Sequence, residues 1–522
     1  MANLYPIGVQ SFAKLREEGY IYVDKTAFIK KLVTEGNCYF LSRPRRFGKS
    51  LLLSTIEAFY QGRKDLFEGL AISRAEHDWQ THPVLHIALN AWEYKDSDSL
   101  SQKLSYDFER WEQLYGTERQ SASHSERFRY IIEQAYAKTG RKVVILIDEY
   151  DKPLLDTASN TDLQDIYRSQ LKAIYGNLKN CDRYIEFAML TGVSRFGKLS
   201  IFSDLNNLND ISLSEKYSAL CGMTEEEIKA NFSDGVRELA TKNGLSVNDA
   251  YSLLKENYDG YHFSPCSPDI YNPFSLLKAL YDHNIGSYWF STGTPTFLAD
   301  MIRRSEIELR NLENMDEEID DLMDASFDLS STIPIMYQSG YLTIKGYDSR
   351  FRTVTLGYPN LEVERGFLNG LMKIFTGNRN GRSEFDVRKF VLDVETGHVD
   401  DFMTRLQSLF SGYHYDQMDL GDLELHYRNV IYLVMKLMGY YTEAEMRTAS
   451  GRIDLLVKTS KFLYLFEFKI NHSPQDAMDQ INSRDYLLPF RADGRQIIKV
   501  GANFDDFIRS ISSWLVEFDR KP

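Results

Sequence analysis

Two stretches of this sequence combine residue types and spacings that can do chemistry on phosphates. In the first, the tripeptide Gly48–Ser50 lies between an apolar run, Cys38–Ser42, and an apolar helical segment, Leu51–Phe59. At such a strand–loop–helix junction the free backbone N–H groups face an anion, the lysine reaches phosphates and the serine hydroxyl ligates Mg²⁺. We expect the loop and helix start to bind a nucleotide through Arg45, Arg46, Gly48, Lys49, Ser50 and Leu51. Arg43 stands where the usual pattern has its first glycine.

A second part of this site is predicted where later strands end. The apolar run 142–147 ends in Asp148 and Glu149. A carboxylate at that place holds Mg²⁺, so we assign Asp148 to the metal and Glu149 to the attacking water. The alternative is that these acids only begin a turn or cap the next helix. After the run 184–190, Arg195 is a candidate for sensing the γ-phosphate, and a surface arginine in a turn is the competing interpretation.

The second stretch is a predicted hairpin near the C-terminus that carries two acids and a lysine. Strands 451–457 and 462–470 flank a turn that we centre on Thr459 and Ser460. This register puts Asp454 diagonally across from Glu467, about 7–8 Å away at the backbone, on the face that also carries Lys469. Two carboxylates at this spacing can share one Mg²⁺, and the lysine supplies a cation beside the water or the phosphate. The alternative is an edge hairpin with solvated charges.

Further residues are candidates to complete this second site. Gln480, on the helix that follows the hairpin, is placed to lie over it. A first acid is expected from either Glu424, on the preceding helix, or Glu445, just before the first strand, and spacing does not decide between them. The aromatic turn Tyr258–Phe263 is either a binding element or a corner of the core, and turn residues favour the corner.

Composition limits the classes of protein that fit. The chain has 522 residues, 43% of them hydrophobic, and a net charge of −14, which excludes disorder and a globally basic nucleic-acid coat protein. A polyanion must therefore be met by local basic clusters or through metal ions. Four dispersed cysteines without a paired motif indicate a reducing compartment, and the N-terminus shows no signal peptide. We expect a cytoplasmic protein without a membrane span.

The pattern of apolar runs predicts an α/β protein with three regions. Residues 1–222 alternate apolar strands with amphipathic helices, as in a parallel sheet covered on both faces. Residues 223–365 form a helical or winged-helix middle region, in which the acidic run 305–328 favours a solvated helix face. Residues 366–522 end in a compact α/β unit whose last part is expected to run helix, strand, strand, helix, strand, helix.

Several of these motifs resemble known families. The segments RPRRFGKS (43–50), LIDEYD (146–151), TGVSR (191–195) and FSDLNNLND (202–210) are similar to the AAA-ATPase-like domain family of bacterial proteins. The segments GRID (451–454), FEFK (466–469) and AMDQI (477–481) resemble the PD-(D/E)xK nuclease domain that is usually fused behind it. The resemblance implies a P-loop ATPase core and a C-terminal restriction-endonuclease-like domain. It assigns metal binding and catalysis to Asp454, Glu467 and Lys469, with Gln480 as an orienting partner.

Two functions follow from these patterns. The first is an ATP- and Mg²⁺-dependent protein that hydrolyses nucleic acid, with DNA favoured over RNA and oligomerisation left open. The second is a nucleotide-binding switch or scaffold that binds nucleic acid or a protein without cutting. A third interpretation is that the loop binds another phosphate ligand. Measuring ATP turnover and cleavage on one sample separates the first two, and thermal stabilisation by ATP but not by phosphate or nucleic acid would argue against the third.

Overall fold

A computed structural model describes most of the chain as two compact units. The described residues are 4–74, 79–117, 122–195, 201–202, 205–292, 296–305, 307–323, 325–326, 329–375, 386–411, 420–439, 442–448, 451–483, 490 and 493–519. Unit 1 comprises Met1–Thr292 and Glu313–Glu364, and unit 2 comprises Gly293–Leu312 and Arg365–Pro522. Ser203 and Asp204 of the FSDLNNLND segment lie outside the described residues. No helix in the described part of the chain combines the length and the hydropathy needed to cross a membrane.

Unit 1 is built on a five-stranded parallel sheet in the order β2-β3-β4-β1-β5. Its strands are β1 (Cys38–Ser42), β2 (Val84–Ala88), β3 (Val143–Asp148), β4 (Ile185–Gly192) and β5 (Asn209–Asp210). The central strands are mostly apolar because helices cover both faces, and β1 and β3 are buried along their whole length. This arrangement confirms the predicted P-loop type of parallel sheet.

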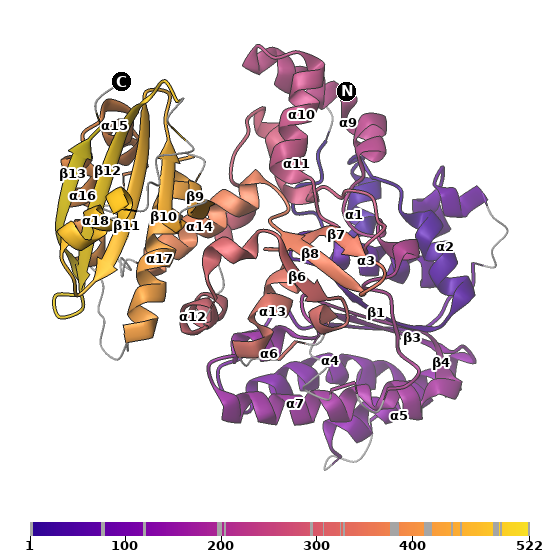
Figure 1. The fold of residues 1–522 in the computed structure, drawn as a ribbon. Coiled ribbons are helices and arrows are strands. Elements are labelled where there is room, and N and C mark those ends of the chain that lie inside the picture. Colours follow the sequence, from indigo (N-terminus) through magenta and orange to yellow (C-terminus); the bar gives the residue numbers. More distant parts are fainter. Residues whose placement is uncertain are drawn as a thin grey trace. The chain divides into compact units, whose positions relative to one another are not determined.

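Helices of unit 1 flank this sheet, and those of its N-terminal half are α1 (Phe12–Glu17), α2 (Thr26–Glu35), α3 (Lys49–Tyr60), α4 (Ser99–Tyr115), α5 (His124–Thr139), α6 (Lys152–Asp156), α7 (Thr161–Tyr175) and α8 (Asn177–Asn180). Figure 1 shows α4, α5 and α7 along one side of the sheet and α1, α2 and α3 on the other. Helix α3 starts directly after the loop that follows β1, so the sheet fixes where this loop sits.

The rest of unit 1 is helical, with a small antiparallel sheet. Helices α9 (Glu225–Asn243), α10 (Val247–Tyr258) and α11 (Pro273–Asp282) share an apolar core, and a capping box of Thr224 and Glu227 begins α9. Helix α13 (Thr332–Ser339) leads into the hairpin β7 (Thr343–Asp348) and β8 (Thr353–Gly357). The solvated helix predicted for the acidic run is wrong, because Met315–Glu318 forms strand β6 beside β8, and its side chains alternate between half-buried and exposed.

Unit 2 has a five-stranded sheet in the order β13-β12-β11-β10-β9. Its strands are β9 (Thr442–Thr448), β10 (Gly451–Lys458), β11 (Phe462–Ile470), β12 (Gln496–Asp505) and β13 (Ser510–Phe518). Its helices are α12 (Thr296–Arg304), α15 (Val387–Thr396), α16 (Val399–Ser411), α17 (Leu420–Leu437) and α18 (Pro474–Ser483), and α14 (Leu361–Phe375) spans the division between the units. All strand pairs are antiparallel except β11 with β12.

The predicted order of elements in the last part of unit 2 is wrong in two places. An extra strand, β9, precedes the hairpin, and the final element is strand β13, not a helix. Strand β13 alternates between less and more exposed side chains along residues 512–517, which is the period of a strand at the edge of a sheet. The α/β character of the unit is nevertheless as predicted.

Candidate functional site

The loop between β1 and α3 spans residues 43–48 and ends at a helix N-terminus. Gly48 has φ 92° and Arg46 has φ 68°, so the loop turns through the left-handed region twice before α3 begins at Lys49. The Lys49 ammonium is buried and donates to the carbonyl oxygens of Arg43 (2.8 Å) and Pro44 (3.0 Å). A phosphate would replace these carbonyls as the partner of the ammonium.

The C-terminal end of β3 meets the start of α3, as the sequence predicts. The Ser50 hydroxyl donates to Asp148 Oδ2 (2.5 Å), and the Thr191 hydroxyl at the end of β4 donates to Asp148 Oδ1 (2.7 Å). Glu149 follows with φ 52°, a costly conformation for a glutamate that the surrounding structure maintains. A hydroxyl and a carboxylate in contact at a phosphate loop are the donor set that suits Mg²⁺ bound with a nucleotide.

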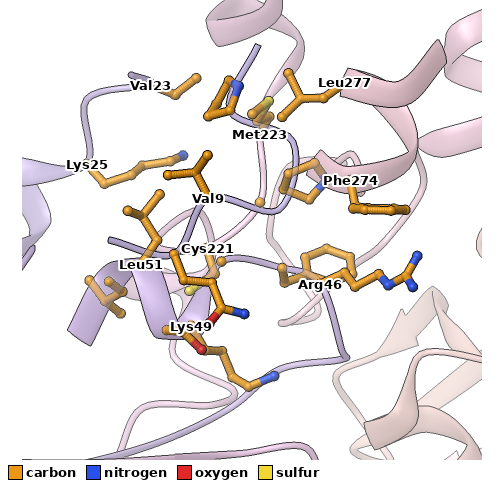
Figure 2. A pocket seen from close by; sticks show the side chains of 18 of the residues that line it. Val9, Val23, Lys25, Arg46, Lys49, Leu51, Cys221, Met223, Phe274 and Leu277 are labelled. Carbon is orange, nitrogen blue, oxygen red and sulfur yellow. The ribbon is translucent and has the colours of Figure 1, made fainter. Parts of the chain in front are cut away.

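A cavity of about 420 Å³ opens beside this loop. Its lining includes every loop residue predicted to bind phosphate and also Glu149. Figure 2 shows Arg46 and Lys49 at one end and Val23, Met223 and Leu277 at the other. A polar end for phosphates and an apolar end for a flat ring are what a nucleotide requires. The apolar walls come from residues 6–23, 220–223 and 273–277, and these were not identified from the sequence.

Two arginines of the predicted motifs point elsewhere. Arg43 is buried, and its guanidinium donates to the carbonyls of Ser42, Ser212 and Tyr217. This side chain therefore links the start of the loop to the segment 212–217. Arg195 Nε lies 2.9 Å from Asp210 Oδ2, and Arg195 is not among the residues that line the cavity. In this structure the candidate γ-phosphate sensor is therefore engaged in an ion pair at β5.

Asp151 organises the loop after β4, a role that the sequence interpretation missed. Its Oδ2 accepts the backbone N–H groups of Val193 (2.9 Å) and Ser194 (2.7 Å). Burial raises the pKa of Asp151 to about 6, and the Ser194 N–H group opposes this rise. The sequence does carry a signal for this role. Asp151 follows Asp148 by three residues in LIDEYD, which is close enough for its carboxylate to reach the end of the neighbouring strand β4.

The β10–β11 hairpin brings Asp454 and Glu467 together, at a register different from the predicted one. The ladder pairs Leu455 with Phe466 and Leu456 with Leu465, and continuing it by one residue sets Asp454 level with Glu467 instead of diagonal to it. The turn is centred one residue later because the Thr459 hydroxyl accepts the N–H groups of Lys461 and Phe462. Beyond Leu455 the Asp454 carboxylate, not a backbone carbonyl, accepts the Phe468 N–H (2.8 Å).

Lys469 and Gln480 complete a polar cluster on this face. Lys469 Nζ donates to Glu467 Oε1 (3.1 Å) and to Gln480 Oε1 (2.6 Å), and Gln480 Nε2 also donates to Glu467 Oε1. Burial, together with the Asp454 charge, raises the pKa of Glu467 to about 7. Glu467 Oε2 is buried and lacks a hydrogen-bond partner within the described structure. A buried carboxylate oxygen without a donor beside a second carboxylate fits a divalent cation.

The two candidates for the first acid occupy different positions. Glu424 lies on α17 and pairs with Arg428 one turn later on the same helix. The backbone of Glu445 lies on β9, not before the first strand as expected, and its neighbours pair with Ile453 and Leu455, so it is level with Asp454. The side chain of Glu445 lies outside what the structure describes. The strand register favours Glu445 over Glu424.

A glycine on β12 allows α18 to approach this cluster. Gly501 pairs with Glu467 in the parallel ladder, and a Cβ at Gly501 would lie 2.6 Å from the Pro474 carbonyl oxygen and 2.9 Å from the Met478 nitrogen. We predict that Gly501→Ala displaces α18, and with it Gln480, and reduces metal-dependent cleavage about tenfold or more, because small misplacements at a reacting centre are costly. Cleavage rates at saturating Mg²⁺ measure this effect.

Gly494 provides the matched control. A Cβ at Gly494 meets no atom within 4 Å, and neither glycine has a left-handed φ. Gly494→Ala should therefore leave cleavage unchanged. Equal rates for the two alanine variants would contradict the role of this close approach.

Comparison with known proteins defines the class. The family model described as "Predicted AAA-ATPase" matches residues 6–202, and the model of the PD-(D/E)XK nuclease superfamily matches residues 422–514. The chain thus combines an AAA-ATPase-like domain with a C-terminal PD-(D/E)XK nuclease domain, as its motifs indicate.

One relative matches almost the whole chain. The chain is 36% identical over 535 residues to the "Uncharacterized protein in vnfD 5'region" of Azotobacter chroococcum mcd 1, with 98% of each covered, and it belongs to the same family. Among solved structures, the Aeropyrum pernix ORC2 protein in "ADPNP-ADP complexes" is 12% identical and covers 69% of this chain and 96% of its own, at a TM-score of 0.25. This TM-score is too low for the fold or the function to be inferred from the likeness.

Proposed function

We propose that the chain is an ATPase coupled to a Mg²⁺-dependent nuclease that hydrolyses phosphodiester bonds of nucleic acid. The observation that carries the nuclease part is the cluster of Asp454, Glu467 and Lys469, in which the buried Glu467 Oε2 has no hydrogen-bond partner among the described residues. The ATPase part is supported by the contact of Ser50 with Asp148 at the polar end of the cavity.

At the nuclease site each side chain has a distinct part in this proposal. Asp454 and Glu467 hold the divalent ion, which supplies an activated water and charge stabilisation when bound. Lys469 places its ammonium where negative charge develops on the phosphate oxygens, and Gln480 fixes the direction of that ammonium through its 2.6 Å contact. With its pKa raised to about 7, Glu467 is partly protonated near neutral pH, and a bound cation would displace that proton.

At the ATP site, Lys49 and the N–H groups at the start of α3 bind the phosphates, and Ser50 and Asp148 hold Mg²⁺. Glu149 orients the attacking water and accepts its proton. Arg45 and Arg46 line the same end of the cavity and add positive charge. Arg195 contributes to the site only if it leaves Asp210.

One experiment tests both parts on a single sample. The full chain is incubated with Mg²⁺ and ATP on supercoiled and linear DNA and on RNA, and phosphate release and strand cleavage are followed together. We expect both activities, with DNA the better substrate, and we expect EDTA to stop them. Asp454→Ala should abolish cleavage while ATP turnover continues. Cleavage that persists in this variant would remove the nuclease assignment.

A second candidate is a nucleotide-dependent switch that binds nucleic acid or a protein partner without cutting. It is favoured by the Lys49 ammonium, which is held by carbonyls of its own loop and must be released by a ligand. Saturable ATP binding without either activity would select this candidate. Stabilisation by inorganic phosphate equal to that by ATP would instead favour another phosphate ligand.

We also infer that the protein works in the cytoplasm with nucleic acid as its partner. All four cysteines are free, and three are buried, which suits a reducing compartment. The three regions 1–222, 223–365 and 366–522 remain our proposal for its functional domains.

A further inference from the structure

The turn Tyr258–Phe263 does not line the nucleotide cavity, yet it is packed against the loop that forms the cavity's polar end. Phe47, which lies in that loop directly before Gly48, is buried, and its ring meets the rings of Tyr261 and Phe263 edge-on, at centroid distances of 4.8 Å and 5.3 Å. The Arg43 guanidinium lies over the Phe263 ring at 4.2 Å. Two aromatic side chains of the turn therefore contact both ends of the loop.

The loop needs such support because its own sequence provides little. Arg43 replaces the first glycine of the usual pattern, and Arg46 adopts a left-handed φ that is strained for a non-glycine residue and that the surroundings must maintain. Other neighbours also hold the loop. Arg46 lies over Phe274 at 3.9 Å and donates to the Tyr288 carbonyl, and the Trp289 indole donates to the Arg45 carbonyl. The loop is held by packing where other loops of this kind use glycine.

The turn itself is rigidly anchored. Gly260 has φ 86°, and a Cβ there would lie 2.2 Å from the Pro359 carbonyl oxygen, so no other residue fits. The His262 N–H donates to the Thr343 hydroxyl (2.7 Å) on β7, and Asn360 donates to the Asp259 carbonyl (2.7 Å). Around the turn, Lys255 lies within 3.3 Å of Asp259 and 3.1 Å of Asp269. A fixed support of this kind can set the position of the loop that it contacts.

We propose that Tyr261 and Phe263 are positioning residues of the nucleotide site, which hold the phosphate-binding loop in its binding conformation through Phe47. This inference rests on the proposed function. Since a displacement of about 1 Å at a reacting centre can cost about 10²-fold, losing the Phe263 ring should weaken Mg·ATP binding about tenfold or more. No contact of either side chain with the ligand is required.

Four substitutions in the full chain separate positioning from general destabilisation. Phe263→Leu and Tyr261→Leu each remove a ring that touches Phe47. Phe47→Leu removes the partner ring. Phe128→Leu is the control, because Phe128 on α5 is buried against Phe108, on the other side of the sheet from α3 (Figure 1). Mg·ATP affinity is measured by calorimetry, and the melting temperature without nucleotide is measured on the same samples.

We expect Phe263→Leu and Tyr261→Leu to lose affinity, and Phe128→Leu to keep it within about twofold even where its melting temperature falls. The double variant Phe47→Leu/Phe263→Leu should lose less affinity than the two single losses combined, since both remove one contact. Affinity that falls in parallel with melting temperature in all variants, or Phe263→Leu binding as tightly as the unaltered protein, would overturn the positioning role. An unaltered protein that fails to bind Mg·ATP would instead contradict the proposed function, and with it this inference.

Discussion

Replacing Lys469 by methionine is expected to lower the rate of nucleic-acid cleavage by about 10²–10³-fold, the usual cost of losing one preorganised donor to developing charge. The Lys469 ammonium contacts Glu467 Oε1 and Gln480 Oε1, so it is aimed at the carboxylates that would hold the metal. Methionine keeps most of the length of the unbranched side chain and removes the ammonium, with its charge and its donors. Single-turnover cleavage at saturating Mg²⁺ measures the effect on the chemical step.

Lys499 offers a matched control for this substitution. It lies on the neighbouring strand β12, is 9% exposed, and donates to the Asn482 amide of α18 at 2.9 Å, as Lys469 donates to the amide of Gln480. Lys499 faces Glu517 and Asp519, not the Asp454–Glu467 pair. Lys499→Met should therefore keep cleavage within a few fold. Equal losses in the two variants would mean that the lysines only stabilise α18.

Much of the fold follows from local pattern alone. The strands Cys38–Ser42 and Val143–Asp148 are apolar except at their last residues, and this pattern is recognisable because the strands of a parallel sheet covered on both faces are mostly apolar. The contact of Ser50 with Asp148 was also predictable, since parallel strands end at one edge of their sheet. The grouping of Asp454, Glu467 and Lys469 on one face needed only strand alternation.

What could not be predicted depends on contacts between distant segments. The hairpin register depended on the Thr459 hydroxyl, whose hydrogen bonds move the turn by one residue and bring Asp454 level with Glu467. The apolar wall of the cavity includes Val23, Met223 and Leu277. Val23 lies about 200 residues before the other two, and none of the three belongs to a recognisable motif. Arg195 follows a strand end as a sensor would, yet only the folded chain shows that Asp210 is within 2.9 Å of it.

The second large effect is expected from Lys49→Met, which should weaken Mg·ATP binding by about 10²-fold. A hydrogen bond to a charged group contributes about 1.5–3 kcal/mol, and Lys49 is placed to make such bonds to phosphate oxygens.

In the protein without nucleotide, Lys49→Met should not lower the stability of the fold. The Lys49 ammonium is buried against two carbonyls, and no described carboxylate lies within ion-pair distance of it, so its charge is costly in the free protein. The melting temperature without nucleotide should therefore stay the same or rise.

ATP at 100 times its Kd should stabilise the unaltered protein by about 2.7 kcal/mol and should stabilise the variant much less. Lys25→Met is the contrasting variant, since Lys25 lines the same cavity but pairs with Glu227 at 2.6 Å, and its loss should lower the melting temperature without nucleotide. A Lys49→Met protein that keeps the full ATP-induced stabilisation would show that the loop after β1 does not bind the phosphates.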